Sequence, residues 1–310
     1  MKVAIIGASG QLGTDICQAL KGFEVLPLTH ADIEITDMSS TKRILRQHMP
    51  DIIVNTAAFL RVDDCETEID RAFAVNALGT RNVAVVAYEL ASKLLHISTD
   101  YIFGVLPEKD APRTKPYTEF DSPAPPNIYG RSKLAGENFV RHLCPRHFIV
   151  RTSGLFGVTG SISKGGNFVE TMLKLGREQD QLKVVNDQVF SPTYTKDLAS
   201  KIAEIIVTDC FGVFHITNRG ACSWYEFARE ILGLAGLKTP LIPISSDLYP
   251  QEAKRPRFSV LDNYQLRLLG MDDMRSWQEA LADYMKGKGY VQTPKNCNFR
   301  GDFFPLKDEQ

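Results

Sequence analysis

The sequence predicts an α/β protein in which a doubly wound parallel sheet carries a second, smaller lobe. Two observations support this fold class. Short apolar segments alternate with amphipathic helical segments over roughly the first half of the chain, and the first of them runs into a glycine-rich turn that precedes a helix. Past about residue 155 this alternation gives way to shorter mixed elements. We therefore expect a Rossmann-type sheet with helices on both faces and a mixed α/β lobe.

The expected elements follow in chain order from apolar runs, helical spacing and capping residues. Strands are predicted at residues 3–6, 23–28, 51–55, 93–98 and 148–152. Helices are predicted at residues 14–20, 39–49 and 72–91, and Asn127 can cap a further helix that runs towards His142. In the second half we expect a helix at 167–176 and an amphipathic segment at 197–207.

These elements suggest three parts. Residues 1–154 form the dinucleotide-binding sheet domain, and a segment at roughly 194–208 returns to pack on it. Residues 155–286 form most of the substrate-binding lobe. Residues 287–310, with Phe303, Phe304 and Pro305, are a carboxyl-terminal tail to which the sequence assigns no role.

Composition limits the function classes. The chain has 310 residues, of which 44% are hydrophobic and 24% are charged, with a formal net charge of -1. Such a balance gives no general field for nucleic acid or anionic membranes. The longest apolar runs are too short for a membrane span or signal peptide, and the six cysteines form no C-x-x-C pair. We expect a cytoplasmic protein with reduced thiols, no nucleic-acid partner and no membrane partner.

Glycines 7, 10 and 13 follow the first strand and open the first helix. The spacing G-x-x-G-x-x-G lets a turn pass closely beneath a pyrophosphate while the helix amino terminus presents free amides to the anion. This pattern indicates a dinucleotide. The end of the second strand carries Thr29 and His30, with Asp32 somewhat late for a ribose, which favours NADPH and leaves NADH possible.

Tyr129 and Lys133 are four residues apart on the expected helix after Asn127, so a phenol and an ammonium share one helix face. A positive neighbour favours the phenolate, so we expect Lys133 to lower the pKa of Tyr129 and make it useful for proton transfer. Thr99 and Asp100 end the fourth strand and should face the same crevice, because ligands bind at the carboxyl ends of parallel strands.

The chain resembles the dTDP-4-dehydrorhamnose reductase family of the extended short-chain dehydrogenase/reductase superfamily, to about residue 286. The segments that carry the resemblance are GASGQLG, PDIIVNTAA, DDCE, AFAVNALGTRN, ISTDYIFG, NIYGRSKLAGE, VRTSG, GGNFVETML, PTYTKDLA and RPRFSVLDN.

The resemblance implies roles for particular residues. Thr99, Tyr129 and Lys133 match the catalytic triad, in which the tyrosine protonates the carbonyl oxygen while the nicotinamide delivers hydride. Asp100 matches a substrate contact. The matching cofactor contacts are Gly10, Gln11 and Leu12 in the glycine loop, Asp37 and Met38 at the adenine, and Ala58, Phe59 and Leu60 after the third strand.

Two positions bear on the reaction and the substrate. Dehydratases of the superfamily carry Asp-Glu after the threonine, whereas this chain has Asp100 and Tyr101, which favours carbonyl reduction over dehydration. Gly154 stands where the reductase family commonly has a tryptophan beside the sugar. Either Phe156 or Phe190 fills that space, or the pocket accepts a different sugar.

Residues of the second lobe are candidates for the nucleotide diphosphate. Asn167 opens a helix after Lys164-Gly165-Gly166, and Arg255 and Arg257 offer forked donors. We assign these three residues to the diphosphate together with Gln188. Asp63, Asp64 and Glu66 are read as caps of the helix that follows them, and His96 as a packed polar group, so no metal is predicted.

The sequence thus predicts a reductase of the 4-keto group of a nucleotide-linked deoxysugar, with dTDP-4-dehydro-L-rhamnose as substrate and NADPH as cofactor. Reduction of another nucleotide 4-keto sugar is an alternative, as is a nonenzymatic role like that of the methionine adenosyltransferase regulatory subunit, which is similar to this family. Members of the family form pairs, some with magnesium, so a homodimer is possible.

Overall fold

A computed structural model of the chain describes residues 1–105, 113–159, 166–249 and 251–291. The central sheet is parallel throughout, and its strands lie in the order β2-β1-β3-β4-β5-β10. They are β1 (Lys2–Ile6), β2 (Glu24–Leu28), β3 (Ile52–Asn55), β4 (Lys93–Thr99), β5 (His147–Thr152) and β10 (Gly212–His215). The first five confirm the predicted strands to within one residue at each end. The sixth, β10, was not predicted.

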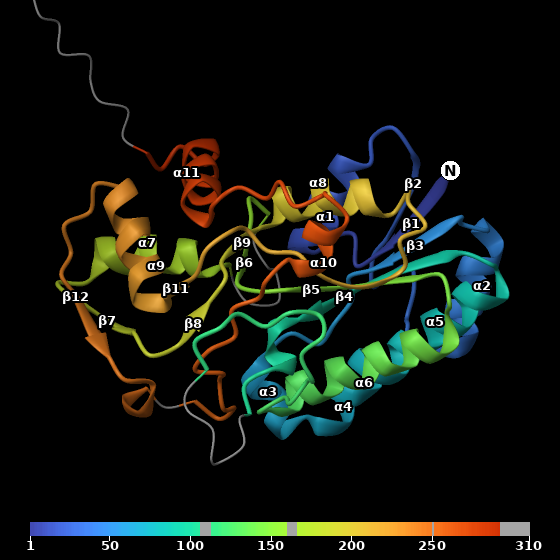
Figure 1. Cartoon of the computed structure of the whole chain (residues 1–310), viewed down its shortest axis with the longest axis horizontal. Helices are drawn as coiled ribbons and strands as arrows, with labels where there is room; N and C mark the ends of the chain where they lie inside the picture. Colours follow the sequence, from blue (N-terminus) through green and yellow to red (C-terminus); the bar gives the residue numbers. More distant parts are fainter. Residues whose placement is uncertain (106–112, 160–165, 250, 292–310) are drawn as a thin grey trace, which may run out of the picture.

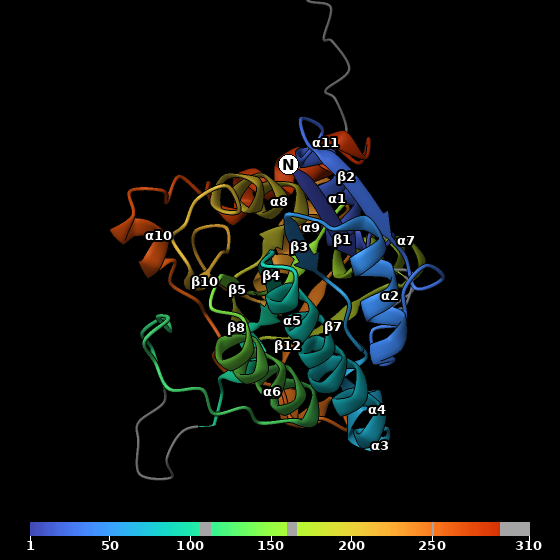
Figure 2. The same ribbon diagram turned by 90° about the vertical axis from the view of Figure 1, so that its right-hand side faces the viewer.

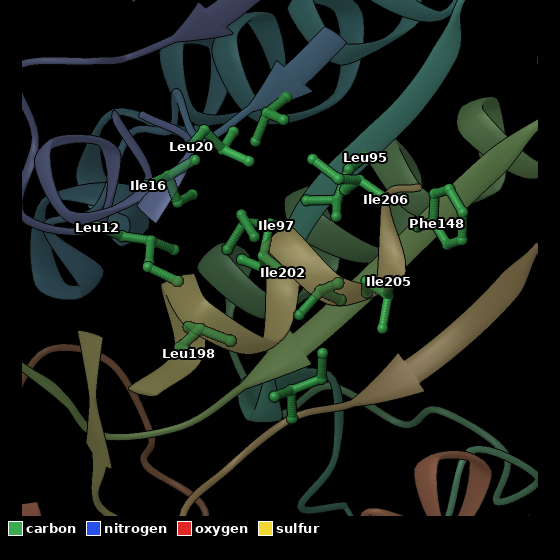
Figure 3. Packing of buried hydrophobic residues seen from close by; sticks show 14 of the residues in the cluster. Leu12, Ile16, Leu20, Leu95, Ile97, Phe148, Leu198, Ile202, Ile205 and Ile206 are labelled. Atoms are coloured by element: carbon green, nitrogen blue, oxygen red, sulfur yellow. The ribbon is translucent and has the colours of Figure 1, made fainter. Parts of the chain in front are cut away.

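Helices cover both faces of the sheet (Figures 1 and 2). One face packs against α1 (Gln11–Ala19) and α8 (Thr195–Ile205), and the other against α2 (Met38–His48), α5 (Thr80–Glu89) and α6 (Ile128–Leu143). Figure 3 shows the first of these cores, where α1 and α8 meet β4 and β5 through aliphatic side chains and Phe148. The doubly wound class is confirmed, and α8 packs against α1 and the sheet.

The connection between β3 and β4 departs from a regular helix. Residues 72–91 were predicted as one helix, but α4 (Ile69–Phe73) passes into the π-helical turn η1 (Ala74–Gly79) before α5 begins. Short π-helical turns recur at functional sites because they redirect a side chain that an α-helix would align differently. Here the turn carries Asn76, whose buried side chain bonds to the loop after β3. A short helix, α3 (Val62–Thr67), precedes α4.

The second lobe has its own aromatic core around Phe156 and Phe227. Its small sheets pair β6 with β9 and β7 with β12 in parallel, and β8 with β11 in antiparallel. Its strands are β6 (Leu155–Phe156), β7 (Leu182–Val185), β8 (Val189–Phe190), β9 (Thr193–Tyr194), β11 (Cys222–Ser223) and β12 (Leu241–Ile244). Its helices are α7 (Phe168–Glu178), α9 (Trp224–Leu234) and α11 (Trp277–Gly287), while α10 (Tyr264–Leu268) packs beside β10.

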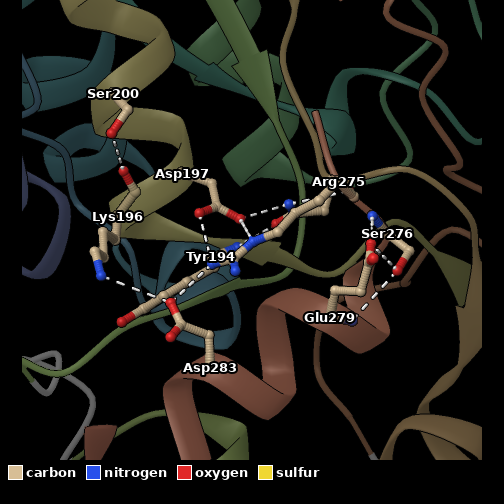
Figure 4. A network of polar contacts seen from close by, with 9 residues as sticks. Tyr194, Lys196, Asp197, Ser200, Arg275, Ser276, Glu279 and Asp283 are labelled. Carbon is tan, nitrogen blue, oxygen red and sulfur yellow. Dashed lines mark hydrogen bonds and ion pairs between the residues drawn. The ribbon is translucent and has the colours of Figure 1, made fainter. Parts of the chain in front are cut away.

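An ion-pair network joins the lobe to the sheet domain (Figure 4). The Arg275 guanidinium donates to Asp197 on α8 at 2.8 Å and to Asp283 on α11 at 3.0 Å. Past α11, the Tyr290 hydroxyl donates to Glu170 at 2.6 Å, so the start of the predicted tail packs on the lobe. Phe303, Phe304 and Pro305 lie outside the described residues.

Candidate active site

A large cavity runs along the carboxyl ends of the sheet strands and continues into the second lobe. Its volume is about 1220 Å³, above the ~300–1,000 Å³ usual for one small ligand, so it has room for two. The cavity collects residues that are far apart in the sequence: the glycine loop after β1, the ends of β3 to β5, the start of α6, and parts of β8 and α9.

The glycine loop passes so close to its neighbours that two of its positions exclude a side chain. Gly7 has a φ of +84°, and a Cβ added there would lie 2.5 Å from the Thr56 hydroxyl oxygen. A Cβ on Gly13 would lie 2.2 Å from the carbonyl oxygen of Gly7. Gly10 precedes α1 without any side-chain cap, so the first amides of the helix are free for a ligand. Gly7, Gly10, Gln11, Leu12 and Gly13 all line the cavity.

Two of the residues named from the sequence lie outside the part of the cavity wall near β2. Thr29, His30 and Thr36 line it, whereas Asp37 and Met38 do not. The Asp37 carboxylate instead caps α2 by accepting a hydrogen bond from the Ser39 amide at 2.8 Å. Asp37 caps α2 because it stands directly before the helix, where free amides need an acceptor.

The loop after β3 is fixed by a residue that the sequence reading missed. Ala58, Phe59 and Leu60 line the cavity, as expected. The Asn76 side chain accepts from the Phe59 amide at 2.8 Å and donates to the Phe59 carbonyl at 3.1 Å and to the Ser132 hydroxyl at 3.0 Å. Asn76 therefore ties this loop to α6. A polar residue inside an alanine-rich helical segment was the available signal.

Helix α6 begins where the sequence predicts, because the Asn127 side chain accepts from the Gly130 amide at 2.8 Å. The Glu66 carboxylate accepts from the Ile128 amide at 2.8 Å. Glu66 thus serves the start of α6 and not the helix expected at 72–91. Asp63 and Asp64 lie in the first turn of α3 and pair with Arg255 and Arg61. Among the described residues, no group of three or more metal-binding side chains gathers.

The structure brings Thr99, Asp100, Tyr129 and Lys133 to one part of the cavity wall. The buried Asp100 carboxylate accepts from the hydroxyls of Ser259 at 2.6 Å, Ser153 at 2.8 Å and Thr99 at 3.1 Å. These hydrogen bonds favour the carboxylate and lower its pKa. The effect of burial is larger, and it raises the pKa of Asp100 to about 6. A carboxyl group with this pKa changes its charge close to neutral pH.

Burial also decides the state of Tyr129, against our expectation of a lowered pKa. It raises the pKa of the phenol well above its ordinary value, while a hydrogen bond with Thr99 works in the opposite direction. Lys133 is not among the groups that shift this pKa, and its ammonium donates to the Ile97 carbonyl at 2.6 Å. Burial lowers the pKa of Lys133 to about 8, and Glu137 opposes that shift. His96 packs within 3.4 Å of the Lys133 nitrogen.

Gly154 lies beneath an aromatic ring. Its φ is +53°, and a Cβ built on it would lie 2.3 Å from Cε2 of Phe190. Of the two aromatic residues named from the sequence, Phe190 therefore fills this space. Phe156 stacks on Tyr194 in the lobe core and is 1% exposed. Trp224, which the sequence reading did not select, stacks on Phe190 and lines the cavity.

The residues assigned to the diphosphate separate into two groups. Asn167 and Gln188 line the cavity, although Asn167 also caps α7 by accepting from the Glu170 amide at 3.0 Å. Arg255 and Arg257 do not line it, and only Pro256 between them does. Arg255 pairs with Asp63 at 2.7 Å. Arg257 is 68% exposed and pairs with Asp247 at 3.2 Å. Lys164 and Gly165 lie outside the described residues.

The chain is similar to known proteins over nearly its whole length. The family described as RmlD substrate binding domain matches residues 1–289. The spore coat polysaccharide biosynthesis protein SpsK of Bacillus subtilis is 40% identical over 92% of this chain and 97% of its own. A dTDP-4-dehydrorhamnose reductase of Mycolicibacterium smegmatis is 37% identical over 91% of this chain and 84% of its own.

Solved structures show the same similarity. A dTDP-4-dehydrorhamnose reductase of Clostridium acetobutylicum superposes with a TM-score of 0.87 at 42% identity, covering 93% of this chain and all of that chain. The enzyme of that name from Bacillus anthracis, solved in complex with NADP, gives a TM-score of 0.86 at 41% identity, covering 92% of this chain and 99% of that one. Within the described residues, no helix is both long and apolar enough to span a membrane.

Proposed function

Because the chain belongs to the RmlD substrate-binding-domain family, we propose that it is an NADPH-dependent reductase of a dTDP-linked 4-keto sugar, and that its substrate is dTDP-4-dehydro-L-rhamnose. One observation carries this proposal above the others: Thr99, Tyr129 and Lys133 meet on the wall of a two-ligand cavity whose other end is a glycine loop. The choice of NADPH is supported by the Bacillus anthracis relative, whose structure was solved in complex with NADP. The product is dTDP-L-rhamnose.

The residues of the chain supply binding and proton transfer, while NADPH, when bound, supplies the hydride. We assign the NADPH pyrophosphate to the glycine loop and the first amides of α1. The Thr99 hydroxyl, which donates to Asp100 in the structure, turns to the 4-keto oxygen, on which negative charge develops. The Tyr129 phenol lies beside Thr99 and gives its proton to the same oxygen. Burial raises the pKa of Tyr129 and so keeps this proton on the phenol near neutral pH.

After the transfer the Thr99 hydroxyl donates to the Tyr129 oxygen and so favours the phenolate that remains. Lys133, one turn further along α6, is positively charged at neutral pH, because its pKa is about 8. We assign Asp100, with Ser153 and Ser259, to contacts with the sugar hydroxyls. Asn167 and Gln188 remain the proposed diphosphate ligands, whereas Arg255 and Arg257 would have to leave their aspartate partners to take part.

The direct test is consumption of NADPH or NADH by the purified chain with dTDP-4-dehydro-L-rhamnose, followed at the absorbance of the reduced nicotinamide. We expect rapid oxidation with NADPH, slower oxidation with NADH, and dTDP-L-rhamnose as the product by NMR. The stereochemistry of that product separates this substrate from other 4-keto sugars. Failure of both cofactors with this substrate and with its stereoisomers would overturn the assignment.

The nonenzymatic alternative makes a different prediction for Tyr129→Phe. A regulatory subunit would keep its function in this variant and would co-purify with an adenosyltransferase, whereas a reductase would lose turnover. We place the protein in the cytoplasm, where sugar nucleotides and NADPH are available. The homodimer remains a prediction, and sedimentation equilibrium of the purified chain measures it directly.

A further inference from the structure

The sugar end of the cavity has an aromatic wall that comes from the second lobe. Phe190, on β8, closes against Gly154 of the sheet domain, where the missing side chain leaves room for the ring edge. Phe190 cannot approach this closely if residue 154 carries a Cβ, because that atom would be 2.3 Å from Cε2 and 2.5 Å from Cδ2 of the ring. The glycine and the phenylalanine therefore form one complementary contact between the two lobes.

Trp224 extends this wall. Its ring centroid lies 3.9 Å from that of Phe190 with the planes 26° apart, and 4.6 Å from that of Phe168. The pairing of β8 with β11, in which Val189 stands opposite Ser223, places the start of α9 beside Phe190. Phe168, Phe190 and Trp224 all line the cavity. An aromatic side chain that stays at a cavity wall offers a surface for the apolar part of a ligand.

The wall begins next to the reactive groups. Gly154 directly follows Ser153, whose hydroxyl donates to the Asp100 carboxylate at 2.8 Å. That carboxylate accepts in turn from Thr99, the neighbour of Tyr129. A sugar whose carbonyl oxygen is held by Thr99 and Tyr129 lies beside this chain of contacts, so the group nearest Gly154 is the sugar and not the base.

We propose that Phe190 and Trp224 bind the apolar face of the sugar ring in the nucleotide-linked substrate, and that these two residues determine which sugar is accepted. This inference rests on the proposed function, because it needs a keto sugar at Tyr129. A deoxysugar presents ring C–H groups and a methyl group on one side, which pack on aromatic rings, and hydroxyls elsewhere, which suit Asp100 and Ser259. Since the wall belongs to the second lobe and Tyr129 to the sheet domain, the sugar is held between them.

The chain contains only two tryptophans, which allows a direct optical test. Trp277, at the start of α11, is 5% exposed in the lobe core and does not line the cavity, so Trp277→Phe is the matched control for Trp224→Phe. Fluorescence of the full chain is titrated with dTDP-L-rhamnose and, separately, with dTDP. We expect Trp277→Phe to show a change with dTDP-L-rhamnose that is clearly larger than with dTDP, and Trp224→Phe to show none.

Steady-state kinetics give a second readout. We expect Trp224→Ala and Phe190→Ala each to raise KM for the keto sugar about 3- to 10-fold, the range for loss of one aromatic contact. The Kd for NADPH should not change, and circular dichroism confirms that each variant is folded. Equal fluorescence changes with dTDP and dTDP-L-rhamnose would place the base or diphosphate at the wall and overturn the inference. So would an unchanged KM in a folded Trp224→Ala.

These results are distinguishable from failure of the proposed function. If dTDP-L-rhamnose changes the Trp224 fluorescence but the chain never reduces the keto sugar, the aromatic wall is supported and the reductase assignment is refuted. If the chain reduces the keto sugar but shows no signal from Trp224 and an unchanged KM in both alanine variants, the reductase assignment is supported and the aromatic wall is refuted.

Discussion

Replacing the buried Asp100 with asparagine should change how the stability of the protein depends on pH. In the folded chain the pKa of Asp100 is about 6, above its ordinary value of 3.8, because burial disfavours the carboxylate. The folded protein therefore holds this proton more tightly than the unfolded chain does. The resulting stability is present at low pH and is lost as pH rises from about 4 to about 6. Asparagine does not titrate, so Asp100→Asn removes this loss.

The magnitude follows from the two pKa values. Their difference corresponds to about 3 kcal/mol in all, and about 2 kcal/mol of it falls between pH 4.5 and pH 7.5. We expect the free energy of unfolding of Asp100→Asn, relative to the unmodified chain, to rise by that amount over this interval. The difference between the two proteins isolates Asp100, because all other titrating groups are common to both.

The assay is urea denaturation at several pH values, followed by circular dichroism. Asp180→Asn, at an exposed position of the lobe, controls for the loss of one negative charge. Ser259→Ala removes the 2.6 Å hydrogen bond that favours the carboxylate, so it should raise the pKa of Asp100 further and extend the loss of stability to higher pH. A constant difference between Asp100→Asn and the unmodified chain from pH 4.5 to pH 7.5 would refute the reasoning.

Three further predictions concern helix α6 and its neighbours. Tyr129→Phe should lower kcat about 10²- to 10⁴-fold while leaving NADPH binding intact, as measured by stopped-flow turnover and nucleotide fluorescence; near-normal turnover would exclude Tyr129 as proton donor. The rate should fall as pH rises past about 8, where Lys133 loses its charge, and a pH profile that is flat to pH 10 would contradict this role. Glu137→Gln should destabilise the fold by about 3–5 kcal/mol in thermal or urea denaturation, because it leaves Arg151, 1% exposed and 2.8 Å from Glu137, buried without its partner. It should also move the alkaline limit to lower pH, since Glu137 raises the pKa of Lys133; an unchanged stability would show that Arg151 finds another partner.

The sequence by itself determined the sheet and the position of the chemistry along it. Apolar runs of the right length indicated the first five strands, because a parallel strand buried on both faces is mostly apolar. Asn127 fixed the start of α6 through a local cap, and the Tyr129 and Lys133 pair follows from four-residue spacing on that helix. Thr99 and the glycine loop were predictable for the same reason, since both lie at strand ends.

Only the tertiary structure decided what each side chain contacts. Burial raised the pKa of Tyr129 where the local pattern had suggested lowering, because desolvation depends on everything packed around the phenol. The Asp37 carboxylate caps helix α2. Arg255 forms an ion pair with Asp63, which is 192 residues away in the chain. The strand β10 is short, and only its pairing with β5 makes it part of the sheet.

Gly154 shows most clearly which information came from the sequence and which came from the tertiary structure. The sequence revealed that a side chain is missing at the end of β5, but a missing atom does not indicate what occupies its place. Phe190 and Trp224 come to that place through the pairing of β8 with β11 in a different lobe. Contacts between distant segments depend on how whole elements pack, and spacing along the chain carries no record of them.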